Sequence, residues 1–195
     1  MATSIFHRKR DLVYLVFFLI HLPVMLAFDL TSFYPTSIKP AWMPQVRAWY
    51  YNTYGDRFFS EPPSWFTLYT LLELTYHLPL TLWAIPALLR NDPRIPLHLL
   101  IFGLQTTITT LTCMAEMLSW EELNEKQRGV QGLGGMYGGY LGLGWRMWKE
   151  NSSWVMAGRR ANFSIGVFMA VDCYARLDQL LSKTKGIEPV TKKEL

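Results

Sequence analysis

Ionisable side chains lie inside or at the ends of long apolar stretches of this chain, and they are the residues most able to do chemistry. Asp29 lies near the end of the first stretch, while Glu73 and His77 lie in the second, four residues apart. Residues at i and i+4 share one face of a helix, so Glu73 and His77 should project to the same side. Because an acid at the centre of an apolar helix costs about 2.5 kcal/mol or more, these positions indicate a functional site.

The chemistry that we expect is that of a carboxyl pair. Two nearby carboxylates in a low dielectric cannot both stay ionised, so one keeps its proton and the pair carries roughly one negative charge. Such a pair binds a cationic amine or a hydroxyl group. Asp29 and Glu73 are the predicted partners, and Glu116 should lie in the same half of the membrane-spanning region. The alternative is that the acids only join helices by hydrogen bonds, which contribute about 0.6 kcal/mol on average.

The tripeptide His-Leu-Pro occurs in both of these stretches, at 21–23 and 77–79. Proline frees a carbonyl group one turn earlier and kinks the helix, and two kinked helices that diverge leave a cavity between them. His21 and His77 should lie deeper in the membrane than the acids. Thr110, from a run of threonines in the third stretch, is a further candidate contact, although such runs more often serve helix packing.

Long apolar stretches must position these side chains, and a bilayer-spanning helix needs about 20 mostly apolar residues. The chain is 50% hydrophobic but only 17% charged, whereas a soluble domain carries about a quarter charged residues. We therefore expect an all-α membrane protein, a four-helix transmembrane bundle, rather than four core helices of a soluble protein. The stretches are Leu12–Leu30, Trp65–Leu89, Ile95–Leu118 and a weaker, glycine-rich one that begins near Gly129.

The charges that flank these stretches predict their orientation, since lysine and arginine gather on the cytosolic side. A basic run at 7–10 precedes the first stretch, and Arg90 and Arg94 lie between the second and third. Both termini should therefore be cytosolic, with the loop 31–64 in the lumen. This loop contains five prolines and many aromatic residues, which predicts an ordered cap at the membrane surface. A cleaved signal peptide is the alternative for the first stretch, but no A-x-A-like site follows it.

Only two cysteines, Cys113 and Cys173, are present, so no disulfide framework is expected. No paired Cys/His spacing suggests zinc, and we expect no metal and no cofactor.

Four short segments carry a family resemblance: HLPVMLAFD (21–29), EPPSWF (61–66), LLELTYHLP (71–79) and MYGGYLG (136–142). They resemble the sigma-2 receptor family, which belongs to the EXPERA superfamily together with the emopamil-binding sterol isomerase. One departure is the proline of the family's YxPY region in the fourth span, which is glycine here.

This resemblance implies a four-helix protein of the endoplasmic reticulum with an occluded cavity near the lumen. Asp29 and Glu73 match the family's acid pair at the ligand's amine, and Asp56 matches a loop aspartate that supports the structure. Tyr137 and Tyr140 match the aromatic wall of the fourth span. Family members bind sterols and cationic amphiphiles and affect cholesterol trafficking, while fungal-type relatives have been linked to the delivery of precursor proteins to mitochondria.

We therefore expect a non-enzymatic membrane protein that binds a sterol or a cationic amphiphilic ligand, and no nucleic acid. The alternative is a sterol isomerase, which needs a proton donor and a group that stabilises a carbocation. The isomerase pattern in the second span is histidine followed four residues later by glutamate, and this chain has the reverse order. The predicted ligand-binding residues are Asp29, Glu73, His21, His77, Thr110, Tyr137 and Tyr140, with Asp56 and Glu116 as structural support.

The expected partners are membrane lipids and membrane proteins of sterol trafficking. Glycine in the fourth stretch is compatible with a homodimer, because small residues let membrane helices approach closely. Lys192 and Lys193 have the spacing of a dilysine retrieval signal, which predicts residence in the endoplasmic reticulum. Together with the four apolar stretches, this predicts a multi-pass protein of the endoplasmic-reticulum membrane.

The expected domain spans 10–178 and is followed by a basic cytosolic tail, 179–195. Inside it, 145–165 (WRMWKENSSWVMAGRRANFSI) interrupt the fourth span. If they are removed, LGGMYGGYLGLG (133–144) joins GVFMAVDCYARL (166–177) into a span of ordinary length. We interpret 145–165 as an insertion, and the alternative is an amphipathic segment that lies on the membrane.

Overall fold

In the computed structural model, residues 4–129, 131–138 and 165–185 are described, and every regular element in these ranges is helical, as predicted. Residues 133–138 are helical as well. A turn of π-helix, η4 (Glu73–His77), joins α3 to α4. The other elements are η1 (Ile5–His7), α1 (Lys9–Ala27), η2 (Asp29–Phe33), α2 (Trp42–Tyr54), η3 (Arg57–Phe59), α3 (Ser64–Leu72), α4 (Leu78–Arg90), α5 (Ile95–Leu118), α6 (Glu125–Arg128) and α8 (Ile165–Lys185).

Turn residues in the sequence set several of the helix ends. Helix α3 begins directly after Pro62-Pro63, and Pro63 caps it with an extended backbone. Gly55 ends α2 with a left-handed backbone (φ 70°), a conformation that glycine adopts without steric cost. Asn91 ends α4 in the same way (φ 59°). The tight turn between α4 and α5 follows from this reversal and from Pro96 in the first turn of α5.

Two helical segments of the described chain, Lys9–Phe33 and Ile95–Leu118, are long and apolar enough to cross a membrane. They correspond to the first and third predicted stretches. The second predicted stretch is one helical run over 64–90, divided by η4 into two shorter helices. The four-helix transmembrane bundle and the cytosolic placement of both termini remain predictions.

The described helices carry large apolar side chains on their exposed faces, as is typical of helices in contact with lipid. Leu19 and Ile20 on α1, Leu82 on α4, Ile108 on α5 and Val171 on α8 all lie exposed. A helix on the surface of a soluble protein presents polar side chains there instead. Their exposure supports the predicted class of membrane protein.

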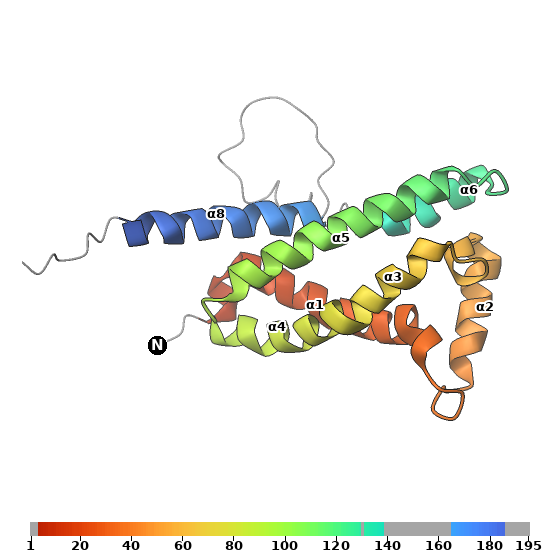
Figure 1. Ribbon diagram of the computed structural model, residues 1–195, viewed down its shortest axis with the longest axis horizontal. Coiled ribbons are helices and arrows are strands. Elements are labelled where there is room, and N and C mark those ends of the chain that lie inside the picture. Colours follow the sequence, from red (N-terminus) through yellow and green to blue (C-terminus); the bar gives the residue numbers. More distant parts are fainter. Residues whose placement is uncertain (1–3, 130, 139–164, 186–195) are drawn as a thin grey trace, which may run out of the picture.

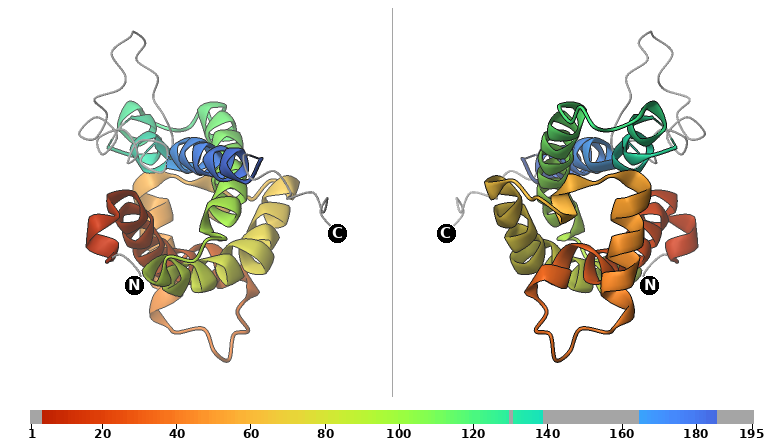
Figure 2. Two further views of the ribbon diagram at one scale, coloured as in Figure 1. Left: turned by 90° about the vertical axis from the view of Figure 1, so that its left-hand side faces the viewer. Right: turned by 90° about the vertical axis from the view of Figure 1, so that its right-hand side faces the viewer.

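The helices pack in pairs, α1 against α4 and α5 against α8 (Figure 1). One apolar cluster, which includes Phe18, Leu88 and Phe102, joins these pairs at the end where α1 begins. A second cluster, which includes Phe58, Met117 and Leu133, lies where α5 ends. Figure 2 shows α2 lying across that same end of the helices. The space between the two clusters is where the predicted site residues meet.

The structure differs from the sequence-based expectation in two details. The first span was expected to continue to Leu30, but α1 ends at Ala27 and Asp29 begins the separate turn η2. The loop 31–64 contains the helix α2, which apolar patterning did not reveal because its residues are mostly polar or aromatic. In this loop the Tyr34 hydroxyl donates to the carbonyl oxygen of Leu26 (2.8 Å), which ties it to the end of α1.

Candidate ligand-binding cavity

A cavity of about 440 Å³ lies between the helices, with walls from every element between α1 and α5 except α4, and from the helical residues 133–138. Pockets of roughly 300–1,000 Å³ hold drug-sized molecules. Most of the wall is apolar or aromatic. Its lining residues are His21, Val24, Phe28, Asp29, Trp49, Tyr50, Tyr54, Asp56, Phe59, Phe66, Tyr69, Thr70, Glu73, His77, Thr106, Thr109, Thr110, Cys113, Met136 and Tyr137.

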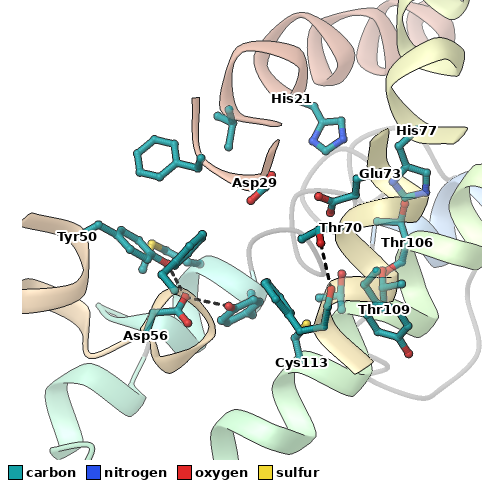
Figure 3. Close-up of a pocket in the computed structure, with 18 of the residues that line it drawn as sticks. His21, Asp29, Tyr50, Asp56, Thr70, Glu73, His77, Thr106, Thr109 and Cys113 are labelled. Carbon is teal, nitrogen blue, oxygen red and sulfur yellow. Dashed lines mark hydrogen bonds between the residues drawn. The ribbon is translucent and has the colours of Figure 1, made fainter. Parts of the chain in front are cut away.

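Asp29 and Glu73 point toward one another across this cavity (Figure 3). Asp29 comes from the first residue of η2 and Glu73 from the first residue of η4. The Oε2 atom of Glu73 is buried and accepts no hydrogen bond from any described residue. A buried carboxylate oxygen without a donor is costly, so this atom is suited to a donor supplied by a ligand.

The π-turn η4 sets the position of Glu73 and His77. A π-turn closes its hydrogen bonds between residues five apart and therefore bulges, and such turns are frequent at functional sites. Pro79 lies two residues after this turn and has no backbone N–H to donate to the carbonyl group one turn earlier. The predicted kink at the second His-Leu-Pro tripeptide is therefore accommodated as a widened turn.

The two histidines lie at the deep end of the cavity, against aromatic rings. The imidazole of His21 stacks on Phe17 with ring centroids 5.1 Å apart. The imidazole of His77 lies 4.5 Å from the ring of Phe102. His77 Nε2 and Thr106 Oγ1 are buried, and neither has a hydrogen-bond partner among the described residues. They are polar positions that a ligand can address beyond the acid pair.

Asp56 is fully buried and organises the wall near α2. Its Oδ2 atom accepts hydrogen bonds from the hydroxyls of Tyr50 and Tyr137, both at 2.9 Å, and Oδ1 accepts one from the Phe58 backbone N–H at 3.1 Å. Burial raises the pKa of the Asp56 carboxyl, while these three hydrogen bonds act in the opposite direction. Asp56 therefore joins η3 to α2 and to the helical residues 133–138.

The described lining carries three carboxyl groups and no lysine or arginine, so the cavity favours a cation. Arg47 approaches from outside, where its guanidinium donates to Thr31 Oγ1 (2.8 Å) and lies over the Phe59 ring (4.9 Å). Burial lowers the pKa of Arg47, and the charge of Asp29 partly opposes this shift. Arg47 thus offsets a part of the negative charge without lining the cavity.

The structure brings most of the predicted site residues together. The cavity lining includes six of the seven predicted ligand-binding residues: Asp29, Glu73, His21, His77, Thr110 and Tyr137. Tyr140, Lys192 and Lys193 lie outside the described residues. The acid Glu116 does not line the cavity but lies half-buried near the end of α5. That these residues bind a ligand stays a prediction.

Sequence reasoning did not find several residues of the wall. Trp49, Tyr50 and Tyr54 come from α2. The available signal was the spacing of Tyr50 and Tyr54, which are four residues apart and so share a helix face. Thr106 and Cys113 come from the face of α5 that also carries Thr110. No group of three or more His, Cys, Asp or Glu residues that can hold a metal ion occurs in the part of the chain that the structure describes.

Exposed apolar helix faces and an acidic internal cavity, in a chain that is helical throughout its described elements, are typical of a helical membrane protein. Residues 42–149 match the EBP family, whose description is EXPERA (EXPanded EBP superfamily). This match covers more than half of the 195 residues, and the chain belongs to that family. Asp56, Glu73, His77 and Tyr137 lie within the matched range, whereas His21 and Asp29 precede it.

The chain is also similar to individual proteins of known name. It is 28% identical over 104 residues to Sigma intracellular receptor 2 from Homo sapiens and, equally, from Macaca fascicularis. Each of these matches covers 53% of this chain and 59% of the relative, so the chain spans about three fifths of the length of those receptors. It is 25% identical over 115 residues to Efficient mitochondria targeting-associated protein 19 from Saccharomyces cerevisiae, covering 55% of this chain and 71% of that protein.

Proposed function

We propose that this protein binds a sterol or a cationic amphiphile in the cavity, with the ligand's amine or hydroxyl between Asp29 and Glu73. The observation that carries this proposal is the pair of facing carboxyl groups in a cavity whose described lining has no lysine or arginine. The aromatic and aliphatic walls suit the apolar body of such a ligand. The similarity to a receptor and the family membership support a binding role.

The proposed setting is the endoplasmic-reticulum membrane, crossed four times with both termini in the cytosol. The proposed role is in sterol homeostasis or in the delivery of precursor proteins to mitochondria, together with membrane-protein partners. The name of the yeast relative supports the second of these roles, and the names of the animal relatives support a receptor-like role.

Amine-ligand affinity of purified full-length variants tests the site. Asp29→Asn and Glu73→Gln should each weaken binding of a cationic amphiphile by roughly 10- to 100-fold, since a hydrogen bond to a charged group contributes about 1.5–3 kcal/mol. Glu116→Gln is the matched control, because this acid does not line the cavity. Wild-type affinity in both folded variants would contradict the proposal.

A sterol isomerase is the second candidate, favoured by one observation. Glu73 Oε2 and His77 Nε2 both lie in the cavity wall without a partner among the described residues. A positioned acid and base are the groups that a double-bond shift requires. Expression in a strain that lacks sterol isomerase separates the two functions: a restored sterol profile would establish the enzyme and overturn the non-enzymatic role.

A further inference from the structure

A second pocket, of about 470 Å³, lies at the other end of α1 and is lined mainly by cations. The start of α1, the turn after α4 and helix α8 all contribute to it. We call it the basic pocket, and its lining residues are His7, Arg8, Lys9, Arg10, Asp11, Asn91 and Arg176.

Two buried carboxylates hold the arginines of the basic pocket in place. Asp11 accepts hydrogen bonds from Arg8 (2.5 Å) and Arg176 (2.6 Å). Asp172 accepts from Arg10 (2.6 Å), from Arg176 Nε (2.9 Å) and from the Tyr14 hydroxyl (2.7 Å).

The charges of this cluster do not cancel. Four cations, Arg8, Lys9, Arg10 and Arg176, stand against the two acids Asp11 and Asp172, which leaves an excess of two positive charges.

The available donors come from Lys9 and Arg10. Lys9 is exposed and forms no ion pair with any described residue. Arg10 uses Nη1 on Asp172, and its side chain is still 58% exposed. Its remaining guanidinium nitrogens can therefore reach a ligand while the buried acid fixes the orientation of the side chain.

The basic pocket lies at the level where the apolar faces of the helices begin. Arg8 donates to the carbonyl oxygen of Leu88 (2.7 Å) and to Asn91 Oδ1 (3.1 Å), so the start of α1 is level with the end of α4. Leu89, at that end of α4, is 50% exposed. A group bound in the pocket therefore has apolar surface directly beside it.

We propose that the basic pocket binds the phosphate of an anionic lipid headgroup, with Lys9 and Arg10 as its donors and the acyl chains against the exposed apolar surface near Leu89. Basic pockets between membrane helices recognise such headgroups. Charges that only set the orientation of a membrane-spanning helix need neither a pocket nor buried carboxylates that fix their side chains. The presence of both favours a binding site. An inorganic phosphate ion has the same headgroup chemistry but no acyl chains, so an experiment that compares the two ligands distinguishes a lipid site from a free-phosphate site.

The test uses the full-length protein in a neutral detergent and measures its thermal unfolding midpoint. Short-chain phosphatidic acid, short-chain phosphatidylcholine and inorganic phosphate are titrated separately. Phosphatidic acid should raise the midpoint in a saturable way, and phosphatidylcholine should not. Equal stabilisation by inorganic phosphate would show a free-phosphate site and overturn the lipid proposal, as would equal stabilisation by phosphatidylcholine.

Two variants show whether the pocket is responsible. Lys9→Gln removes an unpaired lining cation and should weaken phosphatidic acid binding about fivefold, the value of one cation near an anionic lipid. Arg90→Gln is the matched control, because Arg90 is exposed at the same end of the helices but does not line the pocket. It should change binding less than Lys9→Gln does. Equal losses in both variants would show diffuse surface attraction and overturn the proposal, as would unchanged binding in Lys9→Gln.

Discussion

The backbones of Gly103 on α5 and Gly166 on α8 lie in direct contact. A Cβ atom added to Gly103 would come within 2.5 Å of the Gly166 carbonyl oxygen, and one added to Gly166 within 2.7 Å of the Gly103 carbonyl oxygen. Membrane helices approach this closely where both carry small residues. This contact places the start of α8 against the middle of α5 and so fixes how the C-terminal helix joins the rest of the chain.

Gly103→Ala should therefore destabilise the protein, because the new methyl group meets backbone atoms that cannot move aside. The expected loss in the free energy of unfolding is about 1–3 kcal/mol, the usual cost of overpacking. Thermal unfolding of the purified protein in detergent measures it. Gly138→Ala is the control: its added Cβ would meet no atom of the described residues within 4 Å, and alanine favours a helix. A Gly103→Ala variant as stable as Gly138→Ala would contradict the close contact.

The hydrogen bonds to Asp56 should stabilise the cavity wall. Tyr50→Phe and Tyr137→Phe each remove one hydroxyl that donates to Asp56 Oδ2. Each substitution should lower the free energy of unfolding by about 1 kcal/mol, measured by denaturant or thermal unfolding. Tyr51→Phe, at an exposed position of the same helix, should change it little. If Tyr50→Phe and Tyr137→Phe are both as stable as Tyr51→Phe, Asp56 does not stabilise the cavity wall through these hydrogen bonds.

Asp56 should also give stability a dependence on pH. Burial raises the pKa of the Asp56 carboxyl, so the folded protein keeps the proton of this carboxyl to a higher pH than the unfolded chain does. In the unfolded chain an aspartate has a pKa of about 3.9. The contribution to stability is complete below that value and is lost as pH rises through the folded-state pKa. The unfolding midpoint of wild type relative to Asp56→Asn should therefore fall as pH rises. If the difference between the two unfolding midpoints does not change with pH, the pKa of Asp56 is not raised in the folded protein.

Asp172 should be a major contributor to the packing of α8. This carboxylate is buried and joins α8 to Arg10 and Tyr14 on α1. Asp172→Ala leaves the buried Tyr14 hydroxyl without its acceptor and removes one of the acids that pair with Arg176. A buried polar group left without its partner costs about 1–3 kcal/mol. Asp178→Ala, an exposed acid on the same helix, is the control and should have little effect. Similar unfolding midpoints for both variants would refute the importance of this network.

Removal of 145–165 should leave a folded protein, as the insertion hypothesis predicts. The described residues on either side of this segment contact α5 at two successive levels. Tyr137 packs against the cluster that includes Cys113 and Met117. Gly166 lies against Gly103 and Thr107, further toward the start of α5. With 145–165 removed, Gly166 follows Gly144 and stands eight positions after Tyr137. Eight positions back along α5 from Cys113 and Met117 are positions 105 and 109, close to positions 103–107 that Gly166 contacts.

This agreement is what a single helix antiparallel to α5 requires, because both helices rise by about 1.5 Å per residue. The deletion variant should be expressed, unfold cooperatively and keep its affinity for the amine ligand. A matched deletion of 133–138, which removes Tyr137 and its hydrogen bond to Asp56, should abolish folding. If removal of 145–165 is equally damaging, the segment is an integral part of the fold. Sequencing of the transcript across these codons tests the origin of the segment independently.

The sequence by itself determined the helical class and the positions of the acids along the helices. Hydropathy is a property of consecutive residues, so it identifies apolar segments without knowledge of the fold. The pairing of Glu73 with His77 also follows from local periodicity, since residues four apart share a face. The resemblance to a family, in addition, singled out Asp56 and Tyr137, and the structure joins these two by a hydrogen bond.

The tertiary structure alone decided which of the acids meet. Glu116 was grouped with Asp29 and Glu73 by depth, yet it does not line the cavity. The neighbouring residues Met117 and Trp120 are the ones that turn inward there, into a buried apolar cluster. Depth along a helix follows from counting residues, whereas the direction that a side chain faces depends on how distant helices pack.

The basic pocket was likewise decided by long-range contacts. The basic pocket joins Arg8, Arg10 and Arg176, more than 160 positions apart at the extremes, through two buried aspartates. The sequence marks these residues only as flanking charges, because a charge near a helix end carries no local information about its partner. Their convergence requires α8 to lie beside α1, and the packing of α8 against α5 through Gly103 and Gly166 produces that arrangement.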